Sequence, residues 1–476
     1  MKLLEILSEV FVKDLKIDMN TEITSIESDS RKIVENSLFI AIKGFEVDGH
    51  KYIEKAIENG AIAVLCEEKP EIDIPFILVD DARLALSKIA NNFYQKPSKE
   101  MDVLGITGTN GKTTTTYLVK HILEETGKKA GLIGTNQNMI GQKVIETERT
   151  TPESIELQSL LRDMQKEDCQ NVVMEVSSHA LALHRVNGVY FKVGAFTNIS
   201  QDHLDFHETI EEYAKAKSKL FSRTKFAVIN LDDEFGEYMA EEAKCTVLSY
   251  GIERNDVDLK AQDVELLSDK VVFNAKYLDK TCQMTLNIPG RFSVYNALTA
   301  IGICLSLGID LEEISTALAK AKGVSGRIEV VPTPLDYTVI VDYAHTPDGI
   351  INVLKAVKGF AKGRVIGVFG CGGDRDKIKR PLMAKACSRY SDLSIVTSDN
   401  PRSEEPKDII EDIIVGFEDS PYEKIEDRRE AIAHALSIAK SGDVVVIMGK
   451  GHENYQEIHG VKHHLDDKEE VLKYFK

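Results

Sequence analysis

The sequence contains no tryptophan, and its seven cysteines are scattered along 476 residues without a C-x-x-C pair. Closely spaced cysteines are what zinc sites and redox motifs require, so neither is expected. An odd number of unpaired cysteines fits a protein of the reducing cytoplasm. No apolar run approaches eighteen residues, so no segment is expected to span a membrane.

Positive charge is also in short supply, because 59 Lys and Arg stand against 77 Asp and Glu, a net charge of −18. We therefore expect no broad nucleic-acid-binding or membrane-binding face, although a local basic pocket for a small anion is compatible with this composition. The first residues, MKLLEILSEVFVKDLK, interrupt their apolar positions with Glu5, Glu9 and Asp14. This spacing predicts an amphipathic helix and not a secretion signal.

Apolar residues make up 43% of the chain, enough for sizeable cores, and 476 residues exceed what one core usually holds. In the first hundred residues, β-like runs such as GAIAVLCEE alternate with helical stretches such as ARLALSKIANNFY. This alternation predicts a small α/β domain over residues 1–98. The polar QKPSKE, residues 95–100, is expected to be a linker.

The alternation of strands and helices continues through the rest of the chain. DVLGIT, NVVMEV, VGAFTN and KFAVIN predict a mostly parallel sheet with helices on both faces in a central domain, residues 99–330. TVIVDYAH, RVIGVFG, DLSIVTSDN and DVVVIMGKG predict a further α/β domain over residues 331–476. The expected fold class is α/β with three domains.

The stretch GITGTNGKTTTT, residues 105–116, nearly matches the phosphate loop G-x-x-x-x-G-K-[ST], but Ile106 stands where that pattern has glycine. The expected context is present, because an apolar strand precedes the loop and a helix opened by threonines follows it. Backbone N–H groups can hold polyphosphate, Lys112 adds a positive charge, and Thr113 can offer its hydroxyl to Mg²⁺. The alternative, a plain glycine-rich turn, leaves G-K-T unexplained.

Two later strand ends carry polar groups. Glu175 closes NVVMEV at the edge where parallel sheets usually bind ligands, and its carboxylate could hold Mg²⁺; a solvated glutamate is the alternative. In TNISQDHLDFH, the residues His203, Asp205 and His207 are close together. Their spacing is not that of a zinc motif and Mg²⁺ prefers oxygen ligands, so capping and core roles stay open.

Polar residues also follow the apolar runs of the last third. GCGGDRDKIKRPLM and TSDNPRSEEP contain Arg375 and Arg402, whose guanidinium groups can bind a carboxylate bidentately. MGKGHENY ends a strand in glycines that let a ligand approach the backbone, and its Glu453 can accept an ammonium group. An Asx-Pro turn with a solvated arginine, or a simple surface turn, explains each stretch equally well when it is taken alone.

Together GITGTNGKTTTT, MEVSSHAL, TNISQDHLDFH, GRIEVV, DYAHTPD, GGDRDKIKRP, DNPR and GKGHE resemble the Mur ligase family, over residues from about 105 to 455. That family's phosphate loop, T-G-T-[NK]-G-K-[ST], has no glycine at the position of Ile106. The resemblance implies an N-terminal domain for a UDP-sugar, a central P-loop ATPase domain, and a C-terminal Rossmann-like domain that binds the incoming amino acid. The implied activity is that of an ATP-dependent ligase, which joins meso-diaminopimelate to UDP-N-acetylmuramoyl-L-alanyl-D-glutamate through an acyl phosphate in cytoplasmic peptidoglycan precursor synthesis.

The resemblance also implies three sets of binding residues at the matching positions. The ATP set is Gly108, Thr109, Asn110, Gly111, Lys112, Thr113, Thr114, Asn296, Arg327, Asp342 and His345. The set for the UDP-linked dipeptide is Ser30, Phe45, Glu46, Val47, Thr150, Thr151, Ser177 and Arg185. The diaminopimelate set is Arg375, Asp399, Asn400, Pro401, Arg402, Gly449 and Glu453.

Two smaller sets follow from the same motifs. The expected catalytic residues are Lys112, Glu175, His203 and Lys217. The expected residues around Mg²⁺ are Thr113, Glu175, His203 and Lys217. In the family, a lysine four residues after a tyrosine is carbamylated by CO₂, and counting from Tyr213 this is Lys217. Lys215 and Lys219 flank it, and three solvated lysines on one helix are the alternative that composition suggests.

Other functions are compatible with the sequence. A lysine-adding Mur ligase or a folylpolyglutamate synthetase would have the same fold and phosphate loop, although the motif DNPR argues against both. A phosphate-loop NTPase switch would hydrolyse nucleotide without a small-molecule acceptor. A non-catalytic UDP-sugar-binding module is a further alternative, but it would not explain Lys112 and Thr113. The chain is expected to be a monomer.

Overall fold

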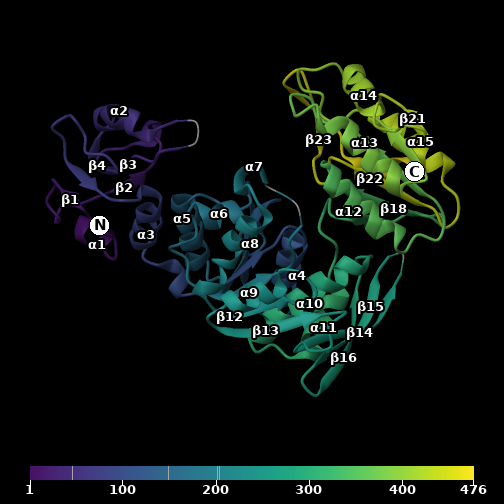
Figure 1. The fold of residues 1–476 in the computed structure, drawn as a ribbon, viewed down its shortest axis with the longest axis horizontal. Helices are drawn as coiled ribbons and strands as arrows, with labels where there is room; N and C mark the ends of the chain where they lie inside the picture. The colour runs from purple at the N-terminus through teal and green to yellow at the C-terminus, as the bar shows by residue number, and fades with distance from the viewer. Residues whose placement is uncertain (45–46, 148, 201, 203, 268) are drawn as a thin grey trace. The chain divides into compact units, whose positions relative to one another are not determined.

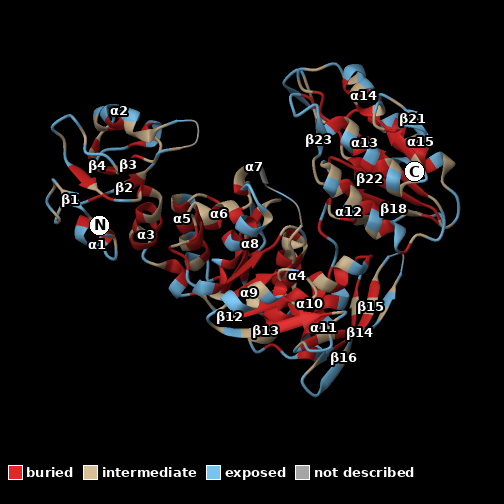
Figure 2. Ribbon diagram, in the orientation of Figure 1, coloured by how far each residue is buried: buried red, intermediate tan, exposed pale blue. Residues whose placement is uncertain are grey.

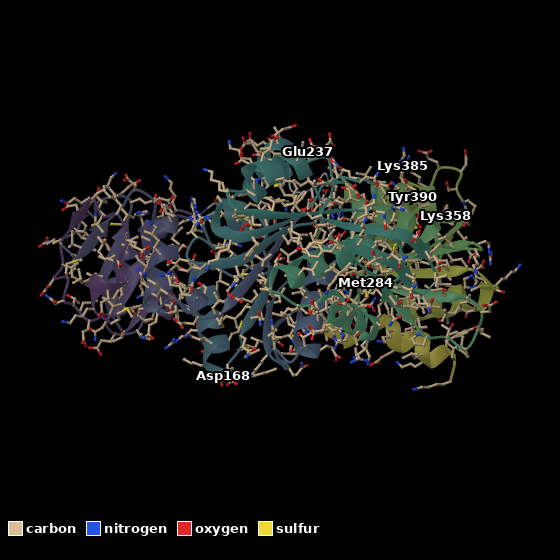
Figure 3. All side chains as sticks on the ribbon, turned by 90° about the horizontal axis from the view of Figure 1, so that it is seen from below. Asp168, Glu237, Met284, Lys358, Lys385 and Tyr390 are labelled. Carbon is tan, nitrogen blue, oxygen red and sulfur yellow. The ribbon has the colours of Figure 1, made fainter. Side chains whose placement is uncertain are left out.

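The computed structural model describes residues 1–44, 47–147, 149–200, 202, 204–267 and 269–476. Two compact units are distinguished by their internal packing: Met1–Asp258 with Thr299–Ile309, and Leu259–Leu298 with Asp310–Lys476 (Figure 1). In both units the central strands are mostly buried, and exposed residues lie on helix surfaces, on loops and in edge strands (Figure 2). Charged side chains such as those of Glu237 and Lys385 project into solvent, with exposed fractions of 67% and 69% (Figure 3).

The first sheet of the first unit has five strands, and helices cover both of its faces. Its order is β1 (Asp14–Leu15), β5 (Phe76–Leu78), β4 (Ala61–Cys66), β3 (Ser37–Ile40) and β2 (Ser25–Glu27), with only β1 antiparallel. In β3, Leu38 and Ile40 pack in the cluster with α1 (Leu3–Ile6) and α3 (Ala82–Phe93). Phe39 points to the other face and packs with α2 (Ile53–Glu58). A strand that is apolar at every position therefore has a core on each side.

The amphipathic helix predicted at the N-terminus is much shorter than expected. Only Leu3–Ile6 are helical, and the chain then runs alongside β5. The amides of Lys13 and Lys16 donate to the carbonyl oxygens of Leu78 and Phe76. Pairing with a buried strand satisfies these backbone groups at the sheet edge, and this tertiary contact overrides the helical pattern.

A second, mostly parallel sheet forms the centre of the first unit. Of its eleven strands, those in this unit are, in order, β13 (Thr246–Gly251), β12 (Thr224–Asn230), β11 (Phe191–Phe196), β6 (Asp102–Thr107), β10 (Asn171–Glu175), β7 (Ala130–Ile133), β8 (Asn138–Ile140) and β9 (Lys143–Ile145). Of these, only β8 and β9 are antiparallel to their neighbours. The helices are α4 (Lys112–Glu125), α5 (Ser154–Lys166), α6 (Ser178–Ala182), α7 (Leu204–His207), α8 (Ile210–Ser218) and α9 (Gly236–Glu242).

The register of this sheet brings three strand ends together. Ile106 in β6 is paired with Glu175 in β10, and Thr107 is paired with Phe196 in β11. Because the three strands are parallel, the loops that follow them leave the sheet at the same edge. Any ligand bound by the loop after Thr107 therefore lies close to the carboxyl ends of β10 and β11.

The segment 95–100, predicted to be a linker, is packed against the central sheet's helices. Gln95 and Lys96 have left-handed backbones (φ 64° and 54°), and a 3₁₀ turn covers Pro97–Lys99. The side chain of Ser98 is buried and accepts a hydrogen bond from the amide of Tyr190 (3.1 Å). The polar residues of this segment therefore form turns and hydrogen bonds in a packed connection, and not a free linker.

The second unit begins with three antiparallel strands and ends with a Rossmann-like sheet. The antiparallel strands are β14 (Leu259–Leu266), β15 (Val271–Tyr277) and β16 (Lys280–Leu286). They are followed by α10 (Arg291–Ser306), which belongs to this unit as far as Leu298, and by α11 (Leu311–Lys320). The Rossmann-like sheet has the order β17 (Glu329–Val331), β18 (Thr338–Asp342), β22 (Val444–Met448), β19 (Val365–Phe369), β20 (Leu393–Val396) and β21 (Tyr422–Lys424). Only β17 is antiparallel, and β23 (Tyr455–Ile458) with β24 (Val461–His464) forms a hairpin.

Helices cover both faces of this Rossmann-like sheet. Val446 and Met448 of β22 pack on the face with α12 (Pro347–Lys358), α13 (Lys379–Tyr390) and α14 (Pro406–Ile414). Val445 and Ile447 pack on the opposite face with α15 (Arg428–Ile438) and α16 (Asp467–Tyr474). The predicted α/β class is confirmed. Within the described part of the chain, no helix has both the length and the apolar character to cross a membrane.

Candidate functional site

The loop between β6 and α4 has the backbone of a phosphate-binding loop. Gly108 and Gly111 have positive φ angles of 149° and 85°. A Cβ atom on Gly108 would lie 1.9 Å from the Thr197 hydroxyl, so only glycine fits. The loop opens directly into α4, whose first turn contains Lys112, Thr113 and the half-buried Thr114. The N-terminal end of α4 carries the positive end of the helix dipole, which favours an anion.

Residues after β11 brace the phosphate loop. The carbonyl of Asn198 accepts from the amide of Thr109 (2.8 Å), and its side-chain oxygen accepts from the amide of Asn110 (2.9 Å). The ammonium group of Lys112 donates to the carbonyls of Gly108 (2.9 Å) and Thr109 (2.8 Å). The Lys112 side chain is therefore held against the loop by two of the loop's own carbonyl groups.

Glu175 is buried at the end of β10, with an exposed fraction of 1%, so the alternative of a solvated glutamate is wrong. Its Oε2 accepts from the hydroxyls of Thr113 and Thr135, each at 3.1 Å, and its Oε1 accepts from the amide of Thr135 (2.9 Å). A Cβ on Gly134 would lie 2.5 Å from Oε1. Glycine at this position thus gives the carboxylate room beside the phosphate loop.

The expected dipeptide residues of the central sheet adjoin Glu175. Thr150 and Thr135 share a hydroxyl contact of 3.0 Å, and Thr151 donates to the backbone carbonyl of Glu175 (2.8 Å). Ser177 caps α6 and donates its amide to Thr151 (3.1 Å). Burial lowers the pKa of Arg185, which is paired with Glu153 at 2.8 Å. These residues form one hydrogen-bonded wall beside the carboxylate.

Lys217 is the buried member of the three lysines on α8. Its side chain is 1% exposed, whereas Lys215 and Lys219 are exposed, so the three are not equally solvated. Its ammonium group donates to the Gly108 carbonyl (2.9 Å) and lies 4.2 Å from the centre of the Tyr213 ring. Burial, and then the charge of Lys112, hold the pKa of Lys217 well below its usual range. A neutral, nucleophilic amine is therefore favoured beside the phosphate loop.

Some expected residues cannot be placed or stand apart from this group. His203, Phe45 and Glu46 lie outside the described residues. Ser30 is buried in a 3₁₀ turn after β2, and its carbonyl accepts from Asn59 (2.8 Å); Val47 is 52% exposed. Among the described residues, no group of three His, Cys, Asp or Glu side chains forms a metal cluster.

The other expected ATP residues belong to the second unit. Asn296 is buried on α10. Arg327 lies over the Tyr343 ring at 5.2 Å, and His345 is exposed with its ring against the same tyrosine. Asp342 ends β18 and accepts from the amides of Ile328 and Ala344, both at 2.7 Å. Burial raises the pKa of Asp342.

A cavity of about 490 Å³ opens at the carboxyl edge of the Rossmann-like sheet. Of the expected diaminopimelate residues, those that line it are Arg375, Asp399, Asn400, Arg402, Gly449 and Glu453. Lys379, Arg380 and Asp376 also line it, so the walls carry both signs of charge. An amino acid with charged groups of both signs is the kind of ligand that such walls bind.

Backbone conformation shapes this cavity. Arg402 has a left-handed backbone (φ 51°), and its Nη1 donates to the carbonyl of Gly373 (2.7 Å). With an exposed fraction of 26%, its side chain is not the solvated arginine of a simple turn. Pro401 is buried, and its carbonyl would lie 1.9 Å from a Cβ on Gly373. Gly449 is similarly restricted, because φ is 116° and a Cβ would approach Asp399 to 2.6 Å.

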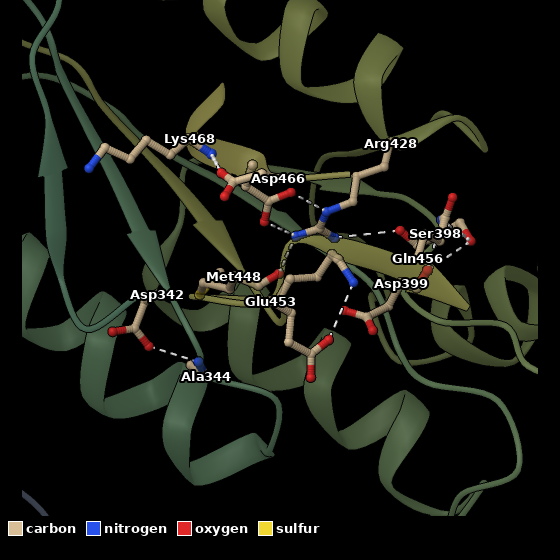
Figure 4. Close-up of polar contacts among 12 residues, drawn as sticks. Asp342, Ala344, Ser398, Asp399, Arg428, Met448, Glu453, Gln456, Asp466 and Lys468 are labelled. Atoms are coloured by element: carbon tan, nitrogen blue, oxygen red, sulfur yellow. Dashed lines mark hydrogen bonds and ion pairs between the residues drawn. The ribbon is translucent and has the colours of Figure 1, made fainter. Parts of the chain in front are cut away.

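Sequence reasoning missed two buried cations beneath this cavity. Arg428 donates to both carboxylate oxygens of Asp467 at 2.7 Å. It also donates to the carbonyl of Ser398, just after β20, and to that of Met448, at the end of β22 (Figure 4). Lys450 is fully buried and donates to Asn400 (3.1 Å). Lys450 stands between two glycines directly after a buried strand, and this sequence context could have indicated a buried lysine near the ligand. Nothing in the local sequence connects Arg428 with its partner on α16.

A glycine loop that joins a parallel strand to a helix, with a buried carboxylate on the next strand, is typical of phosphate-loop nucleotide enzymes. The model of the Mur ligase middle domain matches residues 106–304, that of the Mur ligase glutamate ligase domain matches 326–451, and that of the Mur ligase family catalytic domain matches 22–94. The chain belongs to the Mur ligase family.

Full-length relatives agree with this membership. A Caldanaerobacter subterraneus protein named UDP-N-acetylmuramoyl-L-alanyl-D-glutamate--2,6-diaminopimelate ligase is 50% identical, covering 99% of this chain and 98% of the relative. A ligase of the same name, numbered 1, from Clostridium acetobutylicum is 47% identical, covering 100% and 99%. A solved structure of an enzyme with this name is 34% identical, with a TM-score of 0.76 over 100% of this chain and 98% of that chain.

Proposed function

We propose that this protein is an ATP-dependent ligase that adds meso-2,6-diaminopimelate to the D-glutamate of UDP-N-acetylmuramoyl-L-alanyl-D-glutamate, in the cytoplasm and as a monomer. The observation that carries the proposal is the charged cavity of the second unit, which gathers Arg375, Asn400, Arg402 and Glu453. The names of relatives 44–50% identical to this chain support the same substrates. The proposed domains are residues 1–98 for the UDP-sugar, 99–330 for ATP and 331–476 for the amino acid.

The first half-reaction brings two anions together, the substrate carboxylate and the ATP γ-phosphate. The Lys112 ammonium group and the N-terminal end of α4 would neutralise the phosphates, which permits in-line attack. An acyl phosphate and ADP result. The residues expected to face the nucleotide from the second unit are Asn296, Arg327, Asp342 and His345. The wall of Thr150, Thr151, Ser177 and Arg185 would orient the dipeptide, and Ser30 with residues 45–47 would bind the UDP moiety.

The donor groups around Glu175 fit a magnesium ion. Thr113 and Glu175 offer oxygen atoms, the ligand type that Mg²⁺ prefers, and their 3.1 Å contact shows that both reach one point. When bound, Mg²⁺ supplies positive charge to the phosphate oxygens. The remaining expected contributors are His203 and a carbamylated Lys217. The chain's own part is to hold these oxygens at the mouth of the phosphate loop.

Lys217 fits the chemistry of a carbamate. Its neutral amine can attack CO₂, form an N–C bond and lose a proton, which leaves a carbamate anion in place of a cation. The buried position beside Gly108 and Tyr213 excludes the water that would compete for this group. The product would add a further oxygen ligand next to the phosphate loop, close to Thr113 and Glu175.

In the second half-reaction, the free amine of diaminopimelate attacks the acyl phosphate and expels phosphate. Arg402 and Asn400 would hold the distal carboxylate of diaminopimelate, and Glu453 its distal ammonium group. Arg375, Asp399, Pro401 and Gly449 complete the proposed walls. Lysine lacks the distal carboxylate, so the two cavity donors would be left unpaired with it.

The proposal is tested by phosphate release from the purified protein with ATP, UDP-N-acetylmuramoyl dipeptide and one amino acid at a time. Phosphate release that depends on diaminopimelate supports the proposal. Preference for lysine indicates a lysine-adding ligase, and preference for glutamate on a folate acceptor indicates a folylpolyglutamate synthetase. Hydrolysis of nucleotide without any acceptor indicates an NTPase switch.

A further inference from the structure

Lys450 lies beneath the cavity of the second unit and has no exposed surface. It follows β22 directly and stands between Gly449 and Gly451, which both have positive φ angles. The residues that line the cavity do not include it. Lys450 can therefore influence a ligand only through the side chains that it contacts.

Its polar side-chain contacts are with two residues that do line the cavity, and its ammonium group also lies 5.4 Å from the centre of the Tyr455 ring. The ammonium group of Lys450 donates to Asn400 Oδ1 (3.1 Å) and lies 3.4 Å from Glu453 Oε2. Asn400 Nδ2 donates to the same Oε2 (2.9 Å). The three polar groups thus form a closed triangle, although Asn400 comes from the loop after β20 and the other two from the loop after β22.

This triangle defines which way the Asn400 amide faces. Its oxygen accepts from Lys450 and also from the amide of Glu457 (2.9 Å), and both of these groups can only donate. A flipped amide would place its NH₂ group against two donors and its oxygen against a carboxylate. The orientation with Nδ2 toward Glu453 is therefore strongly preferred, and it leaves the second N–H of that NH₂ group for a carboxylate in the cavity.

We propose that Lys450 is a positioning residue for the amino acid substrate: its buried ammonium group orients the Asn400 amide and the Glu453 carboxylate, and so sets the preference for an amino acid with a second carboxylate. The inference rests on the proposed function. Because both bonds to Glu453 go to Oε2, its Oε1 is the oxygen directed to a substrate ammonium. Without the lysine, the Asn400 oxygen keeps, among the described residues, only the Glu457 amide as a donor and Glu453 Oε2 keeps only Asn400, so both groups are held less firmly for the substrate.

The test uses the full chain with Lys450→Met, which removes the charge and keeps a long side chain. KM for diaminopimelate is expected to rise about 30-fold or more, the usual result of breaking a buried hydrogen-bonded charge pair. KM for ATP and for the UDP-linked dipeptide should stay within about twofold of the wild type, the scatter of distant, independent sites. The preference for diaminopimelate over lysine should fall, because lysine carries no second carboxylate. A purely structural role would not separate these constants.

Two further variants sharpen the result. Lys450→Gln can still donate to Asn400 Oδ1, so it should recover part of the lost preference. Lys385→Met removes an exposed lysine, 69% accessible on α13, and should change none of the constants. In a double-mutant cycle, Lys450→Met and Glu453→Gln should be clearly non-additive, because they act on one triangle.

The outcomes separate the two proposals. If the wild-type protein does not use diaminopimelate, the proposed function itself fails. If it does, but Lys450→Met leaves the KM for diaminopimelate unchanged or raises all three KM values together, the positioning role is overturned. If a thermal scan shows that Lys450→Met does not fold, Lys450→Gln and its double-mutant cycle with Glu453→Gln replace it. The same comparison of the three KM values then supports or overturns the positioning role.

Discussion

Thr113 and Glu175 are 62 residues apart in sequence, yet the threonine hydroxyl donates to the glutamate carboxylate at 3.1 Å. The contact exists because β6 and β10 are parallel neighbours and Ile106 pairs with Glu175. A helix that starts just after β6 therefore has its first turn against the end of β10. This geometry brings together a hydroxyl, a carboxylate and the phosphate loop.

Glu175→Gln is expected to weaken the response to magnesium. The amide keeps the size of the side chain but loses its charge, so the Mg²⁺ concentration for half-maximal phosphate release should rise at least about tenfold, the lower end for residues that support metal ligands. Glu167→Gln, at a side chain that is 66% exposed, is the matched control. An unchanged magnesium requirement in Glu175→Gln would remove this residue from the metal site.

Lys217 is expected to carry a carbamate and Lys215 is not. In protein equilibrated with ¹³C-bicarbonate, a carbamate carbon signal that depends on Lys217 should appear by NMR, because a buried lysine with a lowered pKa is more readily neutral than an exposed one. The signal and the activity should both disappear in Lys217→Ala. Lys215→Ala, on the exposed side of the same helix, should keep both. A signal that persists without Lys217 contradicts the assignment.

Arg402→Ala is expected to abolish efficient use of diaminopimelate while ATP binding is retained. Loss of a buried charged pairing typically costs about 2–5 kcal/mol, which corresponds to a rise in KM of roughly thirtyfold to several thousandfold. Steady-state kinetics and titration with an ATP analogue measure the two effects separately. Arg389→Ala, at an exposed position of α13, serves as the control. Equal loss of ATP affinity in Arg402→Ala would count against its role in the amino-acid cavity.

The ion pair of Arg428 and Asp467 is expected to stabilise the Rossmann-like sheet. Both side chains are fully buried, so Arg428→Met leaves an uncompensated carboxylate and should lower the free energy of unfolding by about 3–5 kcal/mol in urea titrations. The double variant Arg428→Met, Asp467→Leu should lose much less than the two single variants added together. Additive losses would show that the pair is not coupled.

The lowered pKa of Glu404 predicts that the folded protein loses stability in acid. Its hydrogen bonds to Arg380 lower the pKa of its carboxyl group from 4.5 to about 2. Because the folded pKa lies below the unfolded one, the unfolded chain binds more protons between these values. The stabilisation is present above pH 4.5 and is lost as the pH falls toward 2. Glu404→Gln should flatten this part of the unfolding curve, and an unchanged slope would contradict the assignment.

Much of the fold could be predicted from local patterns. The runs NSLFIAIKG, GAIAVLCEE, RVIGVFG and DVVVIMGKG all form strands, because continuous apolar residues need a core on both faces of a sheet. The long helix predicted at the N-terminus was wrong, because strand pairing with β5 satisfies the hydrogen-bonding groups of that backbone segment. Short polar strands such as β21 and the hairpin β23–β24 were missed, since their stability comes from neighbours and not from their own residues.

The sequence by itself determined the phosphate loop and the order of strands and helices, because glycine conformations and apolar periodicity are properties of adjacent residues. Its motifs also named Arg375, Asp399, Asn400, Arg402 and Glu453 of the cavity, but not the neighbouring Asp376, Lys379 and Arg380. Only the tertiary structure decided that Lys217 is buried while Lys215 is exposed, and that Lys450 reaches Asn400 and Glu453. Burial and distance arise when elements far apart in the chain pack together, and no short stretch of sequence contains that information.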